Sequence, residues 1–196
     1  MDKQKASADI IEAALPSVPF EGWNQQVLNK AAVSAGYKKT DVIRVFPSGA
    51  VQAAEQFLHN YDHAMESALQ GYYLDKMKIR ERIATIVRVR LELMAPQREA
   101  VRKAMALLAL PFYANRSLRL LYATVDSIWY AAGDSSTDFN FYTKRLTLAG
   151  VYSATLIFWL DDKSPGYSNT WDFLDRRIAD IMTIEKVKKR IRENFF

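Results

Sequence analysis

The sequence contains no cysteine. This absence excludes a disulfide framework, thiolate metal sites and a catalytic cysteine, and it suits a reducing compartment. The 196 residues are 49% hydrophobic and 25% charged, which is enough apolar material to bury a sizeable core. We therefore expect the chain to fold without metal ions or crosslinks.

Glycine and proline are scarce, with seven and six residues. Long stretches lack both, and no alternating apolar and polar pattern is bounded by hairpin dipeptides, so the sequence predicts an all-α protein. The predicted helices cover residues 4–15, 24–34, 40–46, 49–60, 61–75, 77–94, 97–109, 115–132, 136–161 and 170–182, followed by 184–195.

Long apolar runs are missing too. The longest, from Leu146 to Leu160, has fifteen residues, fewer than the roughly 20 that a membrane span needs. We expect it to form a helix buried inside the fold, so that any membrane contact is peripheral. The first residues, MDKQKASADIIEAAL, contain no continuous apolar region. We therefore expect neither a signal peptide nor a transit peptide there.

Histidine occurs only twice, as His59 and His63 in HNYDH. The pair shares one helical face, but the sequence lacks the glutamate of H-E-x-x-H, and zinc normally needs three protein ligands. We therefore expect solvated or core-edge histidines and no metal site. No E-x-x-H motif of a di-iron oxygenase is present, and we expect no catalytic residues.

Residues 1–60 resemble the helix-turn-helix head of TetR-type transcriptional regulators. Small residues Ala31, Ala32 and Ala35 lie on a helix that ends at Gly36, and a second short helix stops before Pro47. This resemblance predicts a TetR-like helical fold in which a larger helical body follows the head.

The charges of this head do not favour DNA binding. Phosphate contacts need a net positive charge, whereas the head holds equal numbers of the two signs. The basic residues are Lys3, Lys5, Lys30, Lys38, Lys39 and Arg44, and the acidic ones are Asp2, Asp9, Glu12, Glu21, Asp41 and Glu55. The FPS turn continues with Gly49, where TetR-type heads usually place a phosphate-contacting lysine. We expect a degenerate head and no nucleic-acid partner.

Three motifs in residues 121–182 are far more specific. They are D-x-x-W-Y at Asp126–Tyr130, A-G-D-x-S-T-D-F-N-x-Y-T-x-R at Ala132–Arg145, and S-P-x-x-x-x-T-W-x-F-L-x-x-R at Ser164–Arg177. Together they closely resemble the ubiquinone-biosynthesis accessory proteins of the Coq-nine family. The likeness extends more weakly over IIEAAL at 10–15 and the Gly22–Trp23 pair.

The resemblance implies a lipid-binding accessory protein that is not itself an enzyme. Such a protein carries no cofactor, but it holds an isoprenoid lipid or phospholipid and presents polyprenyl quinone intermediates to the di-iron demethoxyubiquinone hydroxylase. A homodimer is expected, since TetR-like folds often dimerise. The implied location is cytoplasmic, on the inner face of the bacterial inner membrane, or the mitochondrial matrix at the inner membrane if the chain is a processed eukaryotic protein.

The family pattern implies a partner-binding patch on one predicted helix, formed by Leu120, Asp126, Trp129 and Tyr130. From the residues alone, Trp129 and Tyr130 point about 100° apart on a helix. Either one of them meets solvent, lipid or a partner, or both are core aromatics. Asp134 and Asp138 flank a helix cap in GDSSTDFN, and we interpret them as architectural.

The chain ends with IEKVKKRIRENFF, a predicted amphipathic helix. Its pattern alone leaves core closure, nucleic-acid binding and membrane binding open, but the family resemblance implies a membrane arm. The apolar stripe comprises Ile184, Val187, Ile191 and Phe195, and the basic face comprises Lys186, Lys188, Lys189, Arg190 and Arg192. These residues are expected to bind anionic membrane lipid.

The sequence thus predicts three parts: the head at 1–60, a lipid-binding body at 61–182, and the terminal helix at 184–196. Within the body we expect an apolar cavity of roughly 300–1,000 Å³, lined by the 104–132 and 146–160 helices. The alternative function is a TetR-like repressor whose body senses an apolar ligand.

Overall fold

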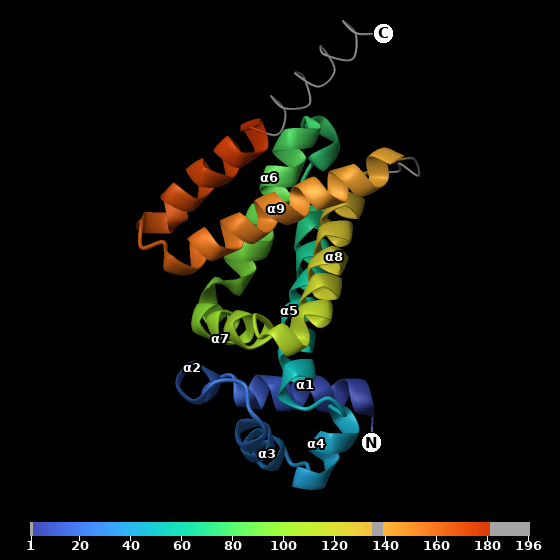
Figure 1. Cartoon of the computed structure of the whole chain (residues 1–196), viewed down its shortest axis with the longest axis vertical. Coiled ribbons are helices and arrows are strands. Elements are labelled where there is room, and N and C mark those ends of the chain that lie inside the picture. The colour runs from blue at the N-terminus through green and yellow to red at the C-terminus, as the bar shows by residue number, and fades with distance from the viewer. Residues whose placement is uncertain (1, 135–138, 181–196) are drawn as a thin grey trace, which may run out of the picture. The chain divides into compact units, whose positions relative to one another are not determined.

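The structure is a computed structural model that describes residues 2–134 and 139–180 (Figure 1). All regular structure in these residues is helical, which confirms the predicted all-α class. The α-helices are α1 (Lys3–Ala14), α2 (Val18–Glu21), α3 (Gln25–Ser34), α4 (Lys39–Val45), α5 (Ala50–Ala68), α6 (Ile79–Met94), α7 (Arg98–Leu108), α8 (Ala114–Ala131) and α9 (Phe139–Asp161). A further helix covers residues 168–180.

One predicted boundary is wrong. Residues 49–60 and 61–75 were expected to form two helices, but α5 runs without a break from Ala50 to Ala68 and is followed by the 3-10 turn Leu69–Gly71. Buried Phe57 and Met65 lie eight residues apart on one face of α5, so the apolar stripe continues through the expected break.

The described chain divides into two compact units built from segments that are distant in the sequence. Unit 1 combines Met1–Ala64 with Leu93–Leu121, and unit 2 combines Met65–Glu92 with the described residues from Tyr122 onward. These units differ from the predicted head and body because residues 93–121 join the first unit.

In unit 1, the predicted pair of short helices is present as α3 and α4. Ala31 and Ala32 are buried on α3, and Gly36 follows the helix with a φ of +82°, a left-handed conformation that favours glycine. Trp23 anchors the core: its Nε1 donates to the carbonyl oxygen of Ala100 at 3.1 Å, and its ring packs 5.1 Å from that of Phe57. The indole N–H of this buried tryptophan is thus satisfied.

Unit 2 is built from α6, the part of α8 from Tyr122 onward, α9 and the helix over 168–180. Its core contains a buried arginine, Arg90, whose guanidinium donates to the hydroxyls of Tyr152 and Thr124. A buried guanidinium is stable only where such partners replace water, so these contacts link α6 to both α8 and α9.

A buried carboxylate holds the turn between α9 and the 168–180 helix. Asp162 accepts hydrogen bonds from the backbone N–H groups of Ser164 at 2.8 Å and Thr170 at 2.9 Å, and from the Thr170 hydroxyl at 2.5 Å. Burial alone would raise the pKa of Asp162, but these hydrogen bonds to the ionised form lower it to about 2. Asp162 therefore acts as an N-terminal cap for the next helix.

The apolar run on α9 is buried on one side only, so the expectation of a helix buried inside the fold is wrong. Val151 and Trp159 are buried, whereas Leu146 is 77% and Ile157 62% exposed. α9 carries apolar residues on all its sides, but neighbouring helices cover only part of its surface. None of the described helices is long and apolar enough to span a membrane.

Candidate functional site

Unit 2 contains an apolar cavity of about 440 Å³, here called the cavity. Four helices contribute its apolar wall: Ile79 and Ile83 come from α6, Trp129 from α8, Leu148 and Val151 from α9, and Ile178 from the helix over 168–180. Its volume lies within the predicted range, and α8 and α9 contribute as predicted. The contribution of α6 was missed, because a helix of residues 79–94 carries no local sign of which neighbour it will face.

The charged side chains of the cavity wall have partners in the protein. Arg82 donates to three backbone carbonyls, those of Met77 at 3.0 Å, Ala132 at 3.0 Å and Asp75 at 2.9 Å. The guanidinium thus ties the start of α6 to the end of α8. It offers the cavity a fixed polar edge and little capacity for a further ligand.

A second charged cluster joins α8 to α9 beside the cavity. Lys144 lies 2.7 Å from the Asp134 carboxylate, which also lies 3.3 Å from buried Arg145. Arg145 Nε donates to Asp126 Oδ1 at 2.6 Å. Asp134 is therefore architectural, as interpreted from the sequence, whereas Asp138 lies outside the described residues. Arg145 is the last residue of the second motif, but the sequence did not predict its role in this cluster.

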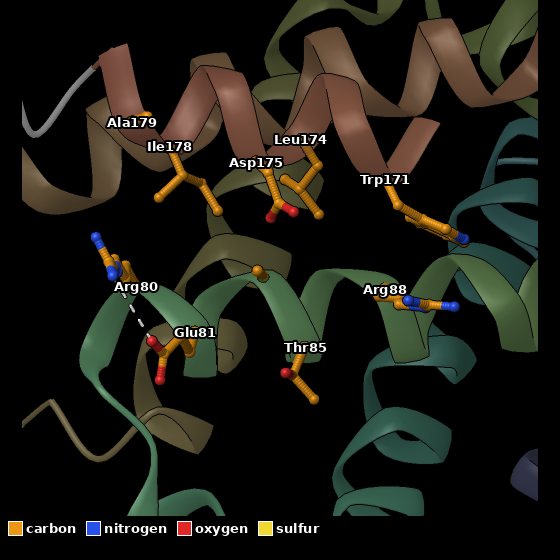
Figure 2. Close-up of a pocket in the computed structure, with 10 residues that line it drawn as sticks. Arg80, Glu81, Thr85, Arg88, Trp171, Leu174, Asp175, Ile178 and Ala179 are labelled. Carbon is orange, nitrogen blue, oxygen red and sulfur yellow. Dashed lines mark ion pairs between the residues drawn. The ribbon is translucent and has the colours of Figure 1, made fainter. Parts of the chain in front are cut away.

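A groove of about 600 Å³ lies between α6 and the 168–180 helix (Figure 2). Trp171, Leu174 and Ile178 line one side, and Arg80 and Arg88 lie on the other. The guanidinium of Arg88 lies 4.9 Å from the centre of the Trp171 ring, and its Nε donates to Glu92 at 2.8 Å. The sequence analysis did not predict this groove.

The predicted patch residues of unit 2 point in different directions. Tyr130 is 77% exposed, and Asp126, one turn earlier on the same face, is about half exposed. Trp129 instead lines the cavity. Its buried Nε1 has no hydrogen-bond partner among the described residues, and the Lys144 ammonium lies 5.5 Å from its ring centre. Of the two alternatives from the residues, the structure thus favours the one in which one aromatic faces outward.

Leu120, the fourth residue of the predicted patch, belongs to unit 1. It lines a polar hollow of about 320 Å³ with Glu55, His59 and Arg116. Arg116 donates to the Glu55 carboxylate at 2.7 Å, so this hollow is structurally organised. Leu120 and Trp129 project from nearly opposite sides of α8, given a turn of 3.6 residues.

Comparison with known proteins finds a family to which part of this chain is similar. The COQ9 family model matches residues 114–185, which include α8, α9 and the helix over 168–180. This chain matches the COQ9 family. The predicted resemblance is thereby confirmed, and the matched COQ9 segment supplies three of the four helices that line the cavity.

Curated COQ9 relatives extend the match over most of the chain. The chain is 34% identical to the mitochondrial ubiquinone biosynthesis protein COQ9 of Rattus norvegicus, an alignment that covers 93% of this chain and 61% of the relative. It is 35% identical to the Drosophila melanogaster protein of the same name, over 91% and 56%. The chain thus spans roughly three fifths of the length of these relatives.

A solved structure shows the fold shared by this COQ9-like chain. A TetR transcriptional regulator from Nitrosomonas europaea superposes with a TM-score of 0.70, covering 88% of this chain and 95% of the regulator, at 18% identity. The predicted TetR-like fold is confirmed. At this low sequence identity, the structural match supports a shared fold and nothing about function.

The two histidines of the COQ9-like chain lie close together on α5. Their ring centres are 5.1 Å apart, and His59 Nδ1 is 3.1 Å from Asp62 Oδ2. No group of three or more potential metal ligands occurs among residues 2–134 and 139–180. The expected membrane-binding residues, from Ile184 to Phe195, lie outside the described residues.

Proposed function

We propose that the chain is a lipid-binding accessory protein in ubiquinone biosynthesis. It holds polyprenyl quinone intermediates in the cavity and presents them to the di-iron demethoxyubiquinone hydroxylase, without catalysing a reaction itself. The names of its relatives support the pathway, and the cavity supports the binding of an apolar ligand.

The observation that carries this proposal is an apolar cavity whose wall charges are already paired. An isoprenoid tail is uncharged, so it gains from burial against Ile83, Leu148 and Val151. An anionic ligand would have to compete with the carbonyls around Arg82 and with the carboxylate beside Lys144. The cavity therefore suits a neutral lipid better than a charged metabolite.

The geometry of α8 supports presentation to a partner. Trp129 lines the cavity, while the next residue, Tyr130, projects into solvent. A protein that docks on Tyr130 and Asp126 would thus sit next to one wall of the lipid site. Exposed aromatic anchors typically contribute about 2 kcal/mol or more to an interface, so Tyr130→Asp should weaken co-purification with the hydroxylase. Unchanged capture by the folded variant would contradict this role.

A membrane role for the terminal segment completes the proposal. Each of its five basic residues, such as Lys188, contributes about 1 kcal/mol near an anionic surface. Truncation after Met182 should leave the fold intact but abolish flotation with anionic vesicles, and binding of the intact chain should weaken as salt rises. Equal flotation of both forms would exclude this arm. The mitochondrial names of the relatives favour the matrix side of the inner membrane over a bacterial membrane.

Lipid extraction tests the central proposal. Organic extracts of the purified protein, analysed by mass spectrometry, should contain a polyprenyl quinone or phospholipid. Thr147→Trp would fill the cavity from its edge on α9, and Ser153→Trp is the matched control because Ser153 lies on α9 but is not among the residues that line the cavity or the groove. Loss of lipid from the first variant only is expected. Extracts without lipid, or equal loss from both variants, would contradict the proposal.

The repressor remains the alternative function, supported by the TetR-like fold. Two of the basic side chains in the head are paired with acids of the same head: Lys30 with Glu21 at 3.0 Å and Arg44 with Asp41 at 3.9 Å. Such pairs compete with phosphate contacts. Salt-sensitive retention on duplex DNA, together with failure to float with vesicles, would favour the repressor. Sedimentation of the purified chain tests the predicted homodimer.

A further inference from the structure

The cavity and the groove have two lining residues in common, Arg80 and Ile178. Both spaces are therefore adjacent, and these two side chains lie where they meet. Arg80 is exposed and lies 3.8 Å from Glu81 at the surface. Ile178 is half-buried, and Figure 2 shows its side chain projecting from the 168–180 helix toward α6. Ile178 is thus the apolar side chain at the boundary.

The apolar wall of the cavity continues into the groove. Beyond Ile178, Leu174 and Trp171 extend an apolar side along the same helix, at the four- and three-residue spacing of one helical face. At the edge of the groove, Arg88 is paired with Glu92 and Asp175 is exposed to solvent. These charged side chains can therefore remain hydrated when the groove is occupied. A chain that leaves the cavity past Ile178 therefore stays against apolar side chains.

We propose that Ile178 is the length-determining residue for the bound polyprenyl chain: short tails end inside the cavity, and longer tails pass Ile178 into the groove. This inference rests on the proposed lipid-binding function. It names a specificity residue that the family motifs do not contain, because Ile178 follows the last motif residue, Arg177.

The volumes support this division. A carbon group is close in size to a water molecule, which occupies about 30 Å³, so a five-carbon isoprene unit needs about 150 Å³. The cavity of about 440 Å³ then has room for roughly three units, and the groove of about 600 Å³ for roughly four more. A tail longer than about three units therefore exceeds the cavity, and the groove is the adjacent space with an apolar side.

Three variants separate the two spaces. Ile178→Phe narrows the boundary, and Ala84→Phe fills the groove from α6 without touching the cavity, since Ala84 lines the groove alone. Ile157→Phe is the matched control, because Ile157 is an exposed isoleucine on α9 that lines neither space. Circular dichroism and thermal unfolding verify that each variant is folded.

The probes are ubiquinones with two and with eight isoprene units, each delivered in the same detergent micelle, with quenching of tryptophan fluorescence as the readout. For the long ubiquinone, we expect Ile178→Phe and Ala84→Phe to raise Kd by about 10-fold. For the short one, Ala84→Phe should change Kd by less than about twofold, because Ala84 lines the groove and not the cavity. Ile157→Phe should bind both ubiquinones as the wild type does.

Each outcome decides a different point. If the wild type binds neither ubiquinone, the proposed function itself fails, and this inference fails with it. If the wild type binds both but the variants weaken short and long ubiquinones equally, or weaken neither, Ile178 does not determine length and lipid binding stands. The proposal is supported if both Ile178→Phe and Ala84→Phe weaken the long ubiquinone, if Ala84→Phe leaves the short one unaffected, and if Ile178→Phe weakens the long one more than the short one.

Discussion

Trp23 in unit 1 and Trp129 in unit 2 have the same side chain in different surroundings. Trp23 is 5% exposed, packs against Phe57, and donates its indole N–H to Ala100. Trp129 lines an apolar cavity, and its buried N–H has no partner in residues 2–134 and 139–180. The first tryptophan is placed for stability. The second retains an unsatisfied donor, a cost of about 1–3 kcal/mol that structural tryptophans normally avoid.

The same contrast extends to the surroundings of each residue. In unit 1, the small side chains of buried Ala31 and Ala32 on α3 let helices approach closely. Near Trp129, branched side chains such as Leu148 and Val151 line open space. Unit 1 therefore packs its aromatic anchor tightly, whereas unit 2 leaves room beside its own.

The largest effect should follow removal of the unit 1 anchor. Trp23→Ala leaves a cavity and removes the hydrogen bond to the Ala100 carbonyl, which should lower the free energy of unfolding by about 3–5 kcal/mol. Phe20→Ala is the control, because Phe20 is 86% exposed, and its loss should change stability by less than about 0.5 kcal/mol. Urea unfolding followed by circular dichroism measures both. Similar losses in the two variants would show that Trp23 is no anchor.

A smaller effect should follow removal of the Asp162 cap in unit 2. Asp162→Ala leaves the N–H groups of Ser164 and Thr170 without their acceptor and should lower the free energy of unfolding by about 1–3 kcal/mol.

The pH dependence of this cap has a defined sign. The pKa of Asp162 is lowered to about 2 in the folded chain, against about 3.9 for an unperturbed aspartate. The ionised form thus stabilises the fold fully above about pH 4, and this contribution is lost as the pH falls toward about 2. The stability gap between wild type and Asp162→Ala should shrink over that range. A gap independent of pH would exclude the ionised cap.

Conservative substitutions sharpen the tryptophan comparison directly. Trp23→Phe removes a satisfied hydrogen bond and should lower the free energy of unfolding by about 1–2 kcal/mol. Trp129→Phe removes an unsatisfied donor, so its loss of stability should be less than about 1 kcal/mol despite the lost ring area. Thermal unfolding of the two variants in parallel is the measurement. A larger loss at Trp129 would reverse the assignment of the two roles.

The smallest effect on stability is expected at the neighbour of Trp129. Tyr130→Asp replaces a side chain that is 77% exposed, so the free energy of unfolding should change by no more than about 0.5 kcal/mol. Chemical denaturation of the purified variant is sufficient to measure it. Substantial unfolding would instead mark Tyr130 as a core residue.

Much of the fold could be predicted because the relevant signals are local. The apolar periodicity of α3 and α6, and glycine after α3 at Gly36, depend only on nearby residues. The failures have equally physical causes. A break was expected near Tyr61, but the apolar face of α5 continues to Met65. The apolar run on α9 was expected to be buried because it is hydrophobic, but Leu146 and Ile157 face outward.

For the candidate site too, some features follow from local sequence and others from the packing of distant helices. Sequence alone determined that the chain is all-α and which motif residues relate it to the COQ9 family, because periodicity and spacing are properties of adjacent residues. Only the tertiary structure decided that Trp129 lines a cavity while Tyr130 faces solvent, and that Ile178 lies between that cavity and the groove. Those features depend on how helices separated by many residues pack, since empty space forms only where their side chains do not fill the gap.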